Sequence, residues 1–380
     1  MSMPYLPEEP PVVVYKNGAA GSQTIPSAAR PTRQSQPLIS VIVLNYNGAN
    51  WLDLCLTSLR NQTIFDQIEI IVADNASPDG STGLAEVIIE DWPNARITQL
   101  GKNFGYSEGN NRAARSATGR YLFFLNNDSW LESDCLEKLL AGVESAGAAI
   151  AAPLVLNYLD ETPQRDASRN GFDMFGLLCC AAISPSDREI FVAGGCALLI
   201  NAEWFQKLGG FDPVFFMYAD EHDICWRAWL AGAKVILAPS ARAHHRSAAS
   251  VNPAGSGKIV EVRTSDTKRF YANRNSLIVL LKNSQHLLFL LVPLQLLMLA
   301  AEGFAMGLLT RRWSHVRRAY LAAVWECWRL RKHIWAERRR LKKLRRRGDI
   351  WMFRFFRTSL NRLEELRRVQ RFGLPKVDSK

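Results

Sequence analysis

An apolar run that ends abruptly in polar residues, Tyr121 to Asp128, constrains the fold of this chain most strongly. Its residues from Tyr121 to Leu125 are all apolar, and Gly119 precedes them. An uninterrupted run of this length is typical of a strand buried on both faces, as in a parallel sheet. The run ends in Asn126-Asn127-Asp128, and ligands of open α/β sheets gather at the carboxyl ends of such strands. This cluster predicts either a site for a divalent ion beside a phosphate or a turn that caps the next helix.

Two earlier segments share this pattern of an apolar strand followed by polar residues. Residues 38–44 end in Asn45-Tyr46-Asn47-Gly48, and residues 69–73 end in Asp74-Asn75. A further strand is predicted near 96–100, and helices are predicted from Asn50, over 82–90 and over 110–116. Strands and helices that alternate in this way predict a doubly wound, mostly parallel α/β sheet. The loops after its strands share one edge, which is the expected nucleotide site.

The second half of the chain has a different pattern. Strands are predicted over 148–156 and 191–200, on either side of an irregular polar insert over 157–188. The acidic cluster Asp220-Glu221-His222-Asp223 then leads into a helix that ends before Gly232, and a strand over 234–237 precedes His244-His245. A hydroxyl nucleophile needs a carboxylate base within hydrogen-bonding reach, which this cluster can supply. The same acids also suit the first turn of a helix.

The C-terminal part of the chain is first apolar and then basic. Residues 277–309 are apolar, but their charge-free stretch 287–301 is shorter than the roughly 20 residues that span a bilayer. Because Pro293 and Glu302 also interrupt the segment, an embedded hairpin or a helix lying in the membrane interface is favoured over a clean span. Dense Arg and Lys then accompany four tryptophans, Trp313, Trp325, Trp328 and Trp335. This combination is typical of an amphipathic interfacial segment.

The positive charge is concentrated in that region. From residue 311 to the end there are 23 Lys and Arg against 6 Asp and Glu, whereas the rest of the chain has 24 against 30. Such asymmetry predicts a polyanionic partner, either anionic lipid or nucleic acid. The adjacent apolar helix favours an anionic membrane surface, and no nucleic acid is expected. A solvated basic helical tail is the alternative that needs no partner.

The composition suggests four parts of the chain. Residues 1–36, rich in Pro, Ser, Ala and Gly, are expected to be a flexible leader, and they contain no apolar segment of the length of a cleavable signal. An α/β domain is expected over 37–250, a connector over 251–276, and a membrane-associating helical region over 277–380. Seven cysteines without a C-x-x-C pair favour free thiols in a reducing compartment, with Cys55, Cys135, Cys196 and Cys225 in the core.

Several separated motifs occur in the order found in one known family. They are Val41-Ile-Val-Leu-Asn-Tyr-Asn47, Val72-Ala-Asp-Asn-Ala-Ser77, Asn103-Phe-Gly-Tyr106, Leu125-Asn-Asn-Asp128, Gly194-Gly195, Phe215-Phe-Met-Tyr218 with the acids after it, and His245. Together they resemble family 2 glycosyltransferases of the GT-A fold, most closely the rhamnosyltransferase-like bacterial branch, over about residues 38–250. The resemblance implies a GT-A type sheet followed by a C-terminal helical appendage that associates with membranes.

The resemblance also implies roles for individual residues. Those expected to bind the nucleotide of a nucleotide-sugar are Asn45, Tyr46, Asn47, Asp74, Asn75, Asn103, Gly105 and Asn126. Asp128 is expected to hold a divalent metal, Mg²⁺ or Mn²⁺, with help from His245 or, one residue earlier, His244. The family's Glu-Asp pair stands here in reversed order, so that Glu221 occupies the position of the base and Asp220 is the second choice. Asp223, Gly194 and Gly195 are expected to orient the site or the acceptor.

The implied activity is an inverting, non-processive transfer of one hexosyl or deoxyhexosyl group, rhamnosyl among them, to a hydroxyl of a lipid-linked glycan. Processive synthases of the family carry a Q-x-x-R-W motif and several spans, and this sequence has neither. The expected location is the cytoplasmic side of a bacterial inner membrane, with peripheral or monotopic attachment. The activity implies a role in cell wall or polysaccharide biosynthesis.

Three alternatives are weaker. A nucleotidyltransferase would need a basic, glycine-rich phosphate loop after the first strand, and Asn45-Tyr46-Asn47-Gly48 contains neither Lys nor Arg. An inactive scaffold would have lost Asp128 or the acidic cluster. A nucleic-acid binder would leave the polar strand ends without an explanation.

Overall fold

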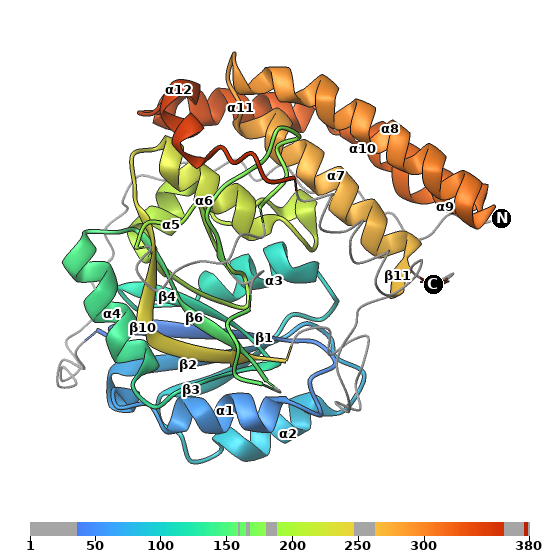
Figure 1. Cartoon of the computed structure of the whole chain (residues 1–380). Helices are drawn as coiled ribbons and strands as arrows, with labels where there is room; N and C mark the ends of the chain where they lie inside the picture. The colour runs from blue at the N-terminus through green and yellow to red at the C-terminus, as the bar shows by residue number, and fades with distance from the viewer. Residues whose placement is uncertain are drawn as a thin grey trace, which may run out of the picture. The chain divides into compact units, whose positions relative to one another are not determined.

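An eight-stranded sheet forms the centre of the computed structural model (Figure 1). The structure describes residues 36–158, 160–164, 168–179, 188–246, 263–360 and 376–378. The predicted leader up to residue 35, part of the 157–188 insert, most of the first half of the connector and residues 361–375 lie outside the described residues. Along the sheet the strand order is β3-β2-β1-β4-β9-β6-β10-β5. Its strands are β1 (Ile39–Asn45), β2 (Ile68–Asp74), β3 (Ala95–Gln99), β4 (Tyr121–Asn126), β5 (Ser129–Leu131), β6 (Ile150–Asn157), β9 (Ala197–Asn201) and β10 (Val235–His245).

The sheet is mostly parallel, as the sequence predicts. Strands β1, β2, β3 and β4 pair in parallel, and β6 pairs in parallel with β10. The exceptions are β9, which lies antiparallel between β4 and β6, and β5, which lies antiparallel to β10 at the edge. Every residue of β2 is buried, and so are Tyr121–Leu125 of β4, because helices cover both faces. The prediction of buried parallel strands that end in polar residues is therefore confirmed.

Two strand predictions are wrong in detail. The single strand expected over 191–200 is two strands, β8 (Val192–Ala193) and β9, which are separated at Gly194-Gly195; β8 pairs with β7 (Ser168–Arg169). The strand expected over 234–237 continues to His245 after an irregularity between Ala238 and Arg242. A proline inside this stretch, Pro239, cannot donate a ladder hydrogen bond, which explains why the pattern of the sequence stops early there.

Helices cover both faces of the sheet and bury its alternating side chains. On one face α1 (Leu52–Arg60), α2 (Ser81–Ile89) and α4 (Cys135–Ala146) share a core with Val41 and Phe123. The opposite face, with Ile42 and Phe124, packs against a second core that holds residues of α3 (Gly105–Ala114), α5 (Ala202–Leu208) and α6 (Asp220–Leu230). Cys55, Cys135, Cys196 and Cys225 are buried thiols, as predicted.

The C-terminal helices complete the second core. Four consecutive residues of α7 (Asp266–Asn283), Leu277 to Leu280, are at most 2% exposed and belong to the same core as α6. The boundary predicted at residue 277 falls inside this helix. The helices that follow are α8 (Leu291–Thr310), α9 (Trp313–Val316), η4 (Arg317–Leu321), α10 (Ala322–Arg329), α11 (Arg331–Leu344) and α12 (Asp349–Met352). In Figure 1 they lie beyond α5 and α6, on the side of the sheet opposite α1 and α2.

Candidate active site

The sheet brings the predicted site residues to one edge. Asn45 of β1 is in register with Asp74 of β2, and Asn126 of β4 is in register with the residue before Asn45. On the other side of β9, His245 of β10 is in register with Asn157 of β6 and, across an antiparallel pair, with Ser129. Because all these strands except that of Ser129 run in one direction, their polar carboxyl ends form a single rim.

Hydrogen bonds join the ends of β1, β2 and β4. The amide of Asn45, which is fully buried, donates to Ser81 Oγ at 2.8 Å and to Asp74 Oδ1 at 3.4 Å. The side-chain oxygen of Asn45, Oδ1, accepts a hydrogen bond from Asn127 Nδ2 at 2.9 Å. Tyr46 and Asn47, which follow directly, are exposed at the rim. Asn127 had no assigned role in the sequence, yet it is the amide that links β4 to β1.

A second set of contacts fixes the loop before α3. Asn75 donates to Asn103 Oδ1 at 3.0 Å and accepts from the main-chain N–H of Phe104 at 2.8 Å. Asn103 Oδ1 in turn accepts from the main-chain N–H of Gly105 at 2.8 Å. These contacts bring the 103–106 loop to the end of β2, where part of the nucleotide site is predicted from the sequence.

Asp128 lies beside His245. The distance from Asp128 Oδ1 to His245 Nε2 is 3.3 Å. The other ring nitrogen, Nδ1, lies 3.1 Å from Oε1 of Gln164, a buried residue of the irregular insert. Burial lowers the pKa of His245, but contacts with Cys196 and Asp128 outweigh burial and raise it well above its usual range.

His244, the alternative by one residue, points elsewhere. Successive side chains of a strand point to opposite faces, so His244 and His245 cannot both face Asp128. The ring of His244 stacks on Trp130 with centroids 5.3 Å apart, and its Nε2 lies 3.7 Å from Glu132.

The residues present fit a divalent metal that also binds a diphosphate. Among the described residues, no group of three or more His, Cys, Asp or Glu side chains is placed to hold a metal by itself. Mg²⁺, however, is commonly held by one or two carboxylates together with substrate phosphates and water. Asp128 supplies such a carboxylate. His245 would add an imidazole once it has lost the proton that its raised pKa favours, with Gln164 orienting the ring.

The two candidate bases have different environments. Asp220 is 3% exposed and accepts a hydrogen bond of 2.6 Å from Ser107 Oγ. Burial, followed by the charge of Glu221, raises the pKa of Asp220 to about 8. Glu221 is half-buried; burial raises its pKa, whereas its own main-chain hydrogen bond and the Arg169 guanidinium oppose this. A Cβ on Gly195 would lie 3.6 Å from Glu221 Oε2, so Glu221 faces the glycine turn before β9.

That glycine turn lies between Glu221 and the histidine. Tyr106 Oη donates to the main-chain oxygen of Gly195 at 2.6 Å, and Gly194 is buried beside it. The next residue, Cys196, lies near enough to His245 to raise the pKa of its imidazole. The turn therefore connects the carboxylate of Glu221 with the Asp128–His245 pair.

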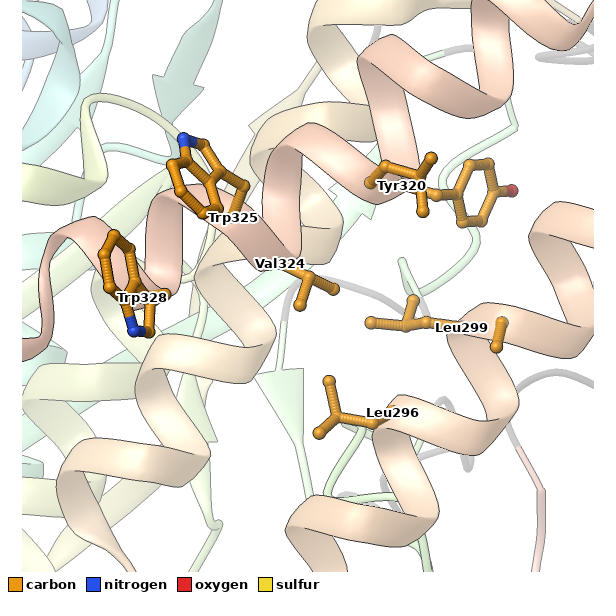
Figure 2. A pocket seen from close by; sticks show the side chains of 8 residues that line it. Leu296, Leu299, Tyr320, Val324, Trp325 and Trp328 are labelled. Carbon is orange, nitrogen blue, oxygen red and sulfur yellow. The ribbon is translucent and has the colours of Figure 1, made fainter.

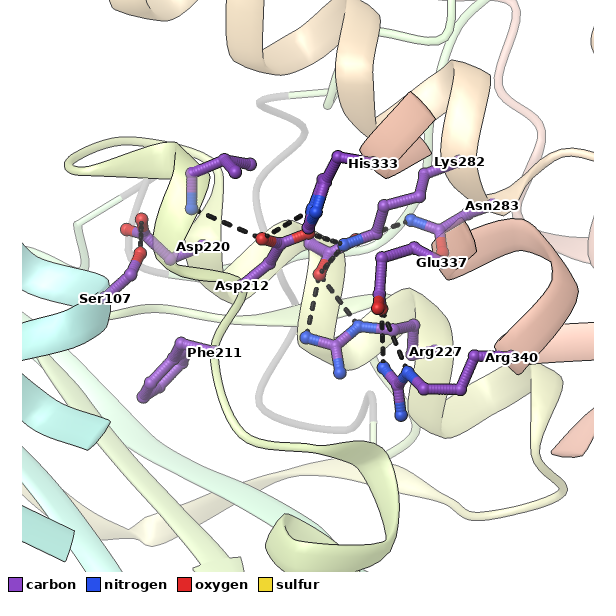
Figure 3. A network of polar contacts seen from close by, with 12 residues as sticks. Ser107, Phe211, Asp212, Asp220, Arg227, Lys282, Asn283, His333, Glu337 and Arg340 are labelled. Carbon is purple, nitrogen blue, oxygen red and sulfur yellow. Dashed lines mark hydrogen bonds and ion pairs between the residues drawn. The ribbon is translucent and has the colours of Figure 1, made fainter. Parts of the chain in front are cut away.

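Asp223 lies in a different set of contacts, a buried ion network with Arg227 and Lys282, which Figure 3 labels. Its carboxylate accepts from Arg227 at 2.7 Å, from Lys282 at 2.9 Å and from Asn283 at 2.9 Å. Lys282 also pairs with Asp212, which His333 of α11 contacts at 3.0 Å. The network joins α6 to α7 and α11, and it does not bring Asp223 to the strand-end rim.

The loop between Asp212 and Asp220 is held by residues that the sequence did not single out. Phe216, Tyr218 and Ala219 all have positive φ, between 64° and 67°. Asn275 of α7 donates to the main-chain oxygens of Phe215, Met217 and Tyr218 at 3.0, 2.7 and 2.8 Å. The neighbouring Arg274 donates to Phe215 O at 3.0 Å. No local pattern could have identified these residues, because their partners lie almost sixty residues earlier in the chain.

The protein has the features of a nucleotide-binding α/β protein. Its mostly parallel sheet carries amides, a carboxylate–imidazole pair and buried acids at the carboxyl edge. Residues 40–223 match the family model described as Glycosyl transferase family 2. The chain thus contains a family 2 glycosyltransferase domain.

Individual proteins agree with this assignment. The chain is 35% identical over 106 residues to an uncharacterised glycosyltransferase, YfnE of Bacillus subtilis (strain 168). This match covers 28% of this chain and 27% of YfnE. It is 25% identical over 269 residues to N-acetylglucosaminyl-diphospho-decaprenol L-rhamnosyltransferase of Mycobacterium tuberculosis (strain ATCC 25618 / H37Rv), covering 63% of this chain and 85% of that protein. The fold is similar to that of GalNAc-T7, solved with UDP, GalNAc and Mn²⁺, with TM-score 0.52 and 17% identity over 65% of this chain and 48% of that one. The match thus spans about a quarter of YfnE and about half of the GalNAc-T7 chain.

Proposed function

We propose that this protein is an inverting, non-processive glycosyltransferase that moves one sugar from a nucleotide-diphosphate sugar to a hydroxyl of a lipid-linked glycan. The observation that carries the proposal is the arrangement around the glycine turn at residues 194–196. Glu221 lies on one side of this turn, and His245, paired with Asp128, lies next to Cys196. A base and a pair of phosphate-side ligands at one strand-end rim are the groups that such a transfer requires.

In this mechanism Asp128 and His245 would hold a divalent ion, Mg²⁺ or Mn²⁺, which neutralises the charge that develops on the diphosphate leaving group. The acceptor hydroxyl gives its proton to Glu221 while its oxygen bonds to the anomeric carbon. The bond from that carbon to the diphosphate oxygen breaks on the opposite side, so the configuration inverts. Asp220 is the second choice as base, because its carboxylate already accepts a hydrogen bond from Ser107, whereas Glu221 faces the glycine turn.

The donor would bind along the rim from β1 to β4. We assign the nucleobase and ribose to Asn45, Tyr46, Asn47 and Asp74, and the adjoining contacts to Asn75, Asn103, Gly105 and Asn126. Tyr46 is 42% exposed beside the buried Asn45–Asp74 contact, which leaves its ring available to a base. The relative solved with UDP supports a nucleotide-sugar donor and a divalent metal.

Two observations bear on the acceptor and on where the reaction takes place. The mycobacterial relative is named for a diphospho-decaprenol acceptor. One helical segment of this chain, Leu288–Thr310, is long and apolar enough to cross a membrane by length and composition. We therefore place the reaction at the cytoplasmic side of a bacterial inner membrane, with an anionic membrane surface as partner and without nucleic acid.

The test is donor turnover by the purified full chain. A panel of uridine-, thymidine- and guanosine-diphosphate sugars is incubated with Mn²⁺, with Mg²⁺ or with a chelator, for wild type, Asp128→Ala, Glu221→Gln and the control Asp53→Asn on α1. We expect metal-dependent turnover that Asp53→Asn keeps and Asp128→Ala loses. Glu221→Gln should reduce the rate by about 10²–10⁴-fold while donor binding persists, because only the base is removed. If no nucleotide binds to the wild type, the proposal is wrong.

A further inference from the structure

An open groove of about 500 Å³ lies between α8 and α10 (Figure 2). Its lining is apolar and aromatic and includes Leu296, Leu299, Tyr320, Val324, Trp325 and Trp328. The hydroxyl of Tyr320 donates to Glu302 at 2.9 Å, so this polar atom already has a partner. The groove therefore offers a ligand almost nothing but hydrocarbon and ring contacts.

The groove belongs to a larger apolar surface. Leu290, just before α8, and Leu297 and Phe304 on α8 follow one another at seven-residue spacing, and they are 63, 67 and 59% exposed. The opposite side of α8, from Val292 to Gly307, is buried against the protein. The large exposed apolar residues from α9 to α11 are Trp313, Leu321, Val324, Trp325, Trp328 and Trp335. Several of them adjoin α8 directly, since Trp325 and Trp328 line the groove with Leu296, and the ring centroids of Trp313 and Phe304 lie 6.2 Å apart. An exposed apolar surface of this kind marks a site of interaction with a protein or a membrane.

The charges around this surface favour an anionic membrane. The exposed basic residues between the end of α8 and the end of α11 are Arg311, Arg312, Arg317, Arg318, Arg329, Arg331, Lys332, Arg339, Lys342 and Lys343. The acids of this stretch, Glu326 and Glu337, are half-buried and pair with Arg329 and Arg340. Tryptophans beside arginines are typical of the boundary between lipid tails and phosphate headgroups. A nucleic acid would match the positive charge but would leave the exposed apolar residues beside it without a partner.

The packing of α8 indicates that it lies in the plane of the membrane. As a spanning helix it would be surrounded by lipid tails, but Gly303 packs against Tyr320, and Glu302 pairs with Arg269 at 3.1 Å. The neighbouring η4 also carries the exposed Arg317 and Arg318. Such charges are strongly disfavoured in the hydrocarbon core, whereas they are favoured at its surface.

We propose that α8 and α10 lie in the surface of an anionic bilayer, with the apolar residues facing the tails and the groove taking one hydrocarbon chain of an anionic lipid. The inference rests on the proposed function only in that a lipid-linked acceptor would be met in that membrane. Binding to vesicles needs neither donor nor acceptor. It can therefore fail while sugar transfer to a soluble acceptor succeeds, and the reverse is equally possible.

The test is flotation of the full chain with vesicles of phosphatidylcholine, with and without phosphatidylglycerol. Variants Leu297→Glu and Trp325→Glu place a charge on the apolar surface, and Val87→Glu is the matched control at a position of α2 that is 72% exposed. We expect wild type and Val87→Glu to float with anionic vesicles only, and the two other variants to lose at least about tenfold in partitioning. Thermal unfolding midpoints show that all four proteins are folded.

A second measurement addresses the groove itself. Bromine on the acyl chains quenches tryptophan fluorescence on contact, so brominated vesicles should quench the wild type more than Trp325→Phe. Equal flotation of all variants, or equal quenching, would overturn the proposal. It would also be overturned if the wild type were a dimer without lipid that Leu297→Glu dissociates, because the surface would then bind a second copy.

Discussion

The side-chain amide of Asn275 donates a hydrogen bond of 2.8 Å to the main-chain oxygen of Tyr218. Two further bonds from the same amide, to Phe215 and Met217, hold the loop that ends at Asp220 and Glu221. Positive φ at three residues of this loop is costly for side chains other than glycine, so the conformation persists only if its surroundings fix it. A helix that the sequence assigned to a connector therefore positions the proposed catalytic base.

Replacing Asn275 by Ala should lower both stability and activity. The main-chain oxygens of Met217 and Tyr218 lose the Asn275 donor, whereas Phe215 O keeps Arg274, and we expect a cost of about 1–3 kcal/mol in the free energy of unfolding. Because the loop before Glu221 then moves, kcat should fall by at least about tenfold with little change in donor binding. Urea unfolding and transfer kinetics with the donor found active measure the two effects.

A matched control is available on the same helix. Asn273 is equally buried and donates one hydrogen bond of 3.0 Å to Ala319 O, away from the loop. Asn273→Ala should lose stability without a comparable loss of kcat at temperatures where it is folded. If the two variants lose activity in proportion to stability alone, Asn275 has no specific positioning role.

Gly105 should tolerate no side chain. Its φ is +73°, and a Cβ there would lie 2.3 Å from the main-chain oxygen of Phe216, which also accepts from Tyr106 N at 2.5 Å. Gly101 is the control in the same loop, since its φ is +81° but no atom lies within 4 Å of an added Cβ. Gly101→Ala should cost about 1 kcal/mol for the backbone conformation alone.

Gly105→Ala must in addition move Phe216 and the loop before Glu221. We expect a larger loss of stability than in Gly101→Ala, together with weaker donor binding, since Gly105 also binds Asn103. Isothermal titration with the nucleotide and urea unfolding separate the two losses. If Gly101→Ala and Gly105→Ala lose the same stability and donor affinity, the contact of Gly105 with Phe216 contributes to neither.

Much of the sheet could be predicted because its signals are local. The apolar runs of β1, β2 and β4 and the polar residues after them indicate buried parallel strands whose ends meet. The insertion of β9 between β4 and β6 could not be predicted, since it depends on pairing between segments roughly 50 to 80 residues apart. The contacts of Asn275 with the 215–218 loop and of Lys282 with Asp223 could not be predicted either. Periodicity gives the buried side of a helix but not the residues that pack against it.

The choice between the two histidines shows where the limit lies. Strand alternation separates His244 from His245 once the strand is known to reach residue 245. The irregularity after Ala238 conceals that continuation in the sequence. Likewise, Gln164 lies in a segment without periodicity, so that its contact with His245 becomes visible only in the structure.

Asp220 and Asp223 should affect stability with opposite dependence on pH. Burial and the charge of Glu221 raise the pKa of Asp220 to about 8, above the value of about 3.9 in an unfolded chain. Its contribution to stability is therefore fully present below about pH 4 and is lost as the pH rises towards 8. Asp220→Asn removes this dependence, so its stability relative to wild type should increase between pH 4 and pH 8.

For Asp223 burial opposes ionisation, but Arg227 and Lys282 outweigh it and lower the pKa. Its contribution is present above about pH 4 and is lost as the pH falls through the lowered pKa. Asp223→Asn should therefore cost most near neutral pH, about 3–5 kcal/mol for breaking a buried ion pair. Urea unfolding of both variants from about pH 2 to pH 8 measures the two slopes, that of Asp223→Asn below about pH 4 and that of Asp220→Asn between about pH 4 and pH 8. Slopes of the same sign would contradict the assignment.

The two histidines of β10 should differ in their effect on metal dependence. His245 Nε2 lies 3.3 Å from Asp128, whereas His244 stacks on Trp130. His245→Ala should raise the Mn²⁺ concentration needed for half-maximal turnover by at least about tenfold, because it removes one of the two proposed protein ligands. His244→Ala loses the contacts with Trp130 and Glu132, so it should lower stability by roughly 1 kcal/mol and leave the metal dependence unchanged. Gln164→Ala should lie between them, since its loss frees the orientation of the His245 imidazole without removing a ligand. Metal titrations of the three variants at saturating donor check this order. If the metal dependence shifts in His244→Ala but not in His245→Ala, the assignment of the ligand to His245 is wrong.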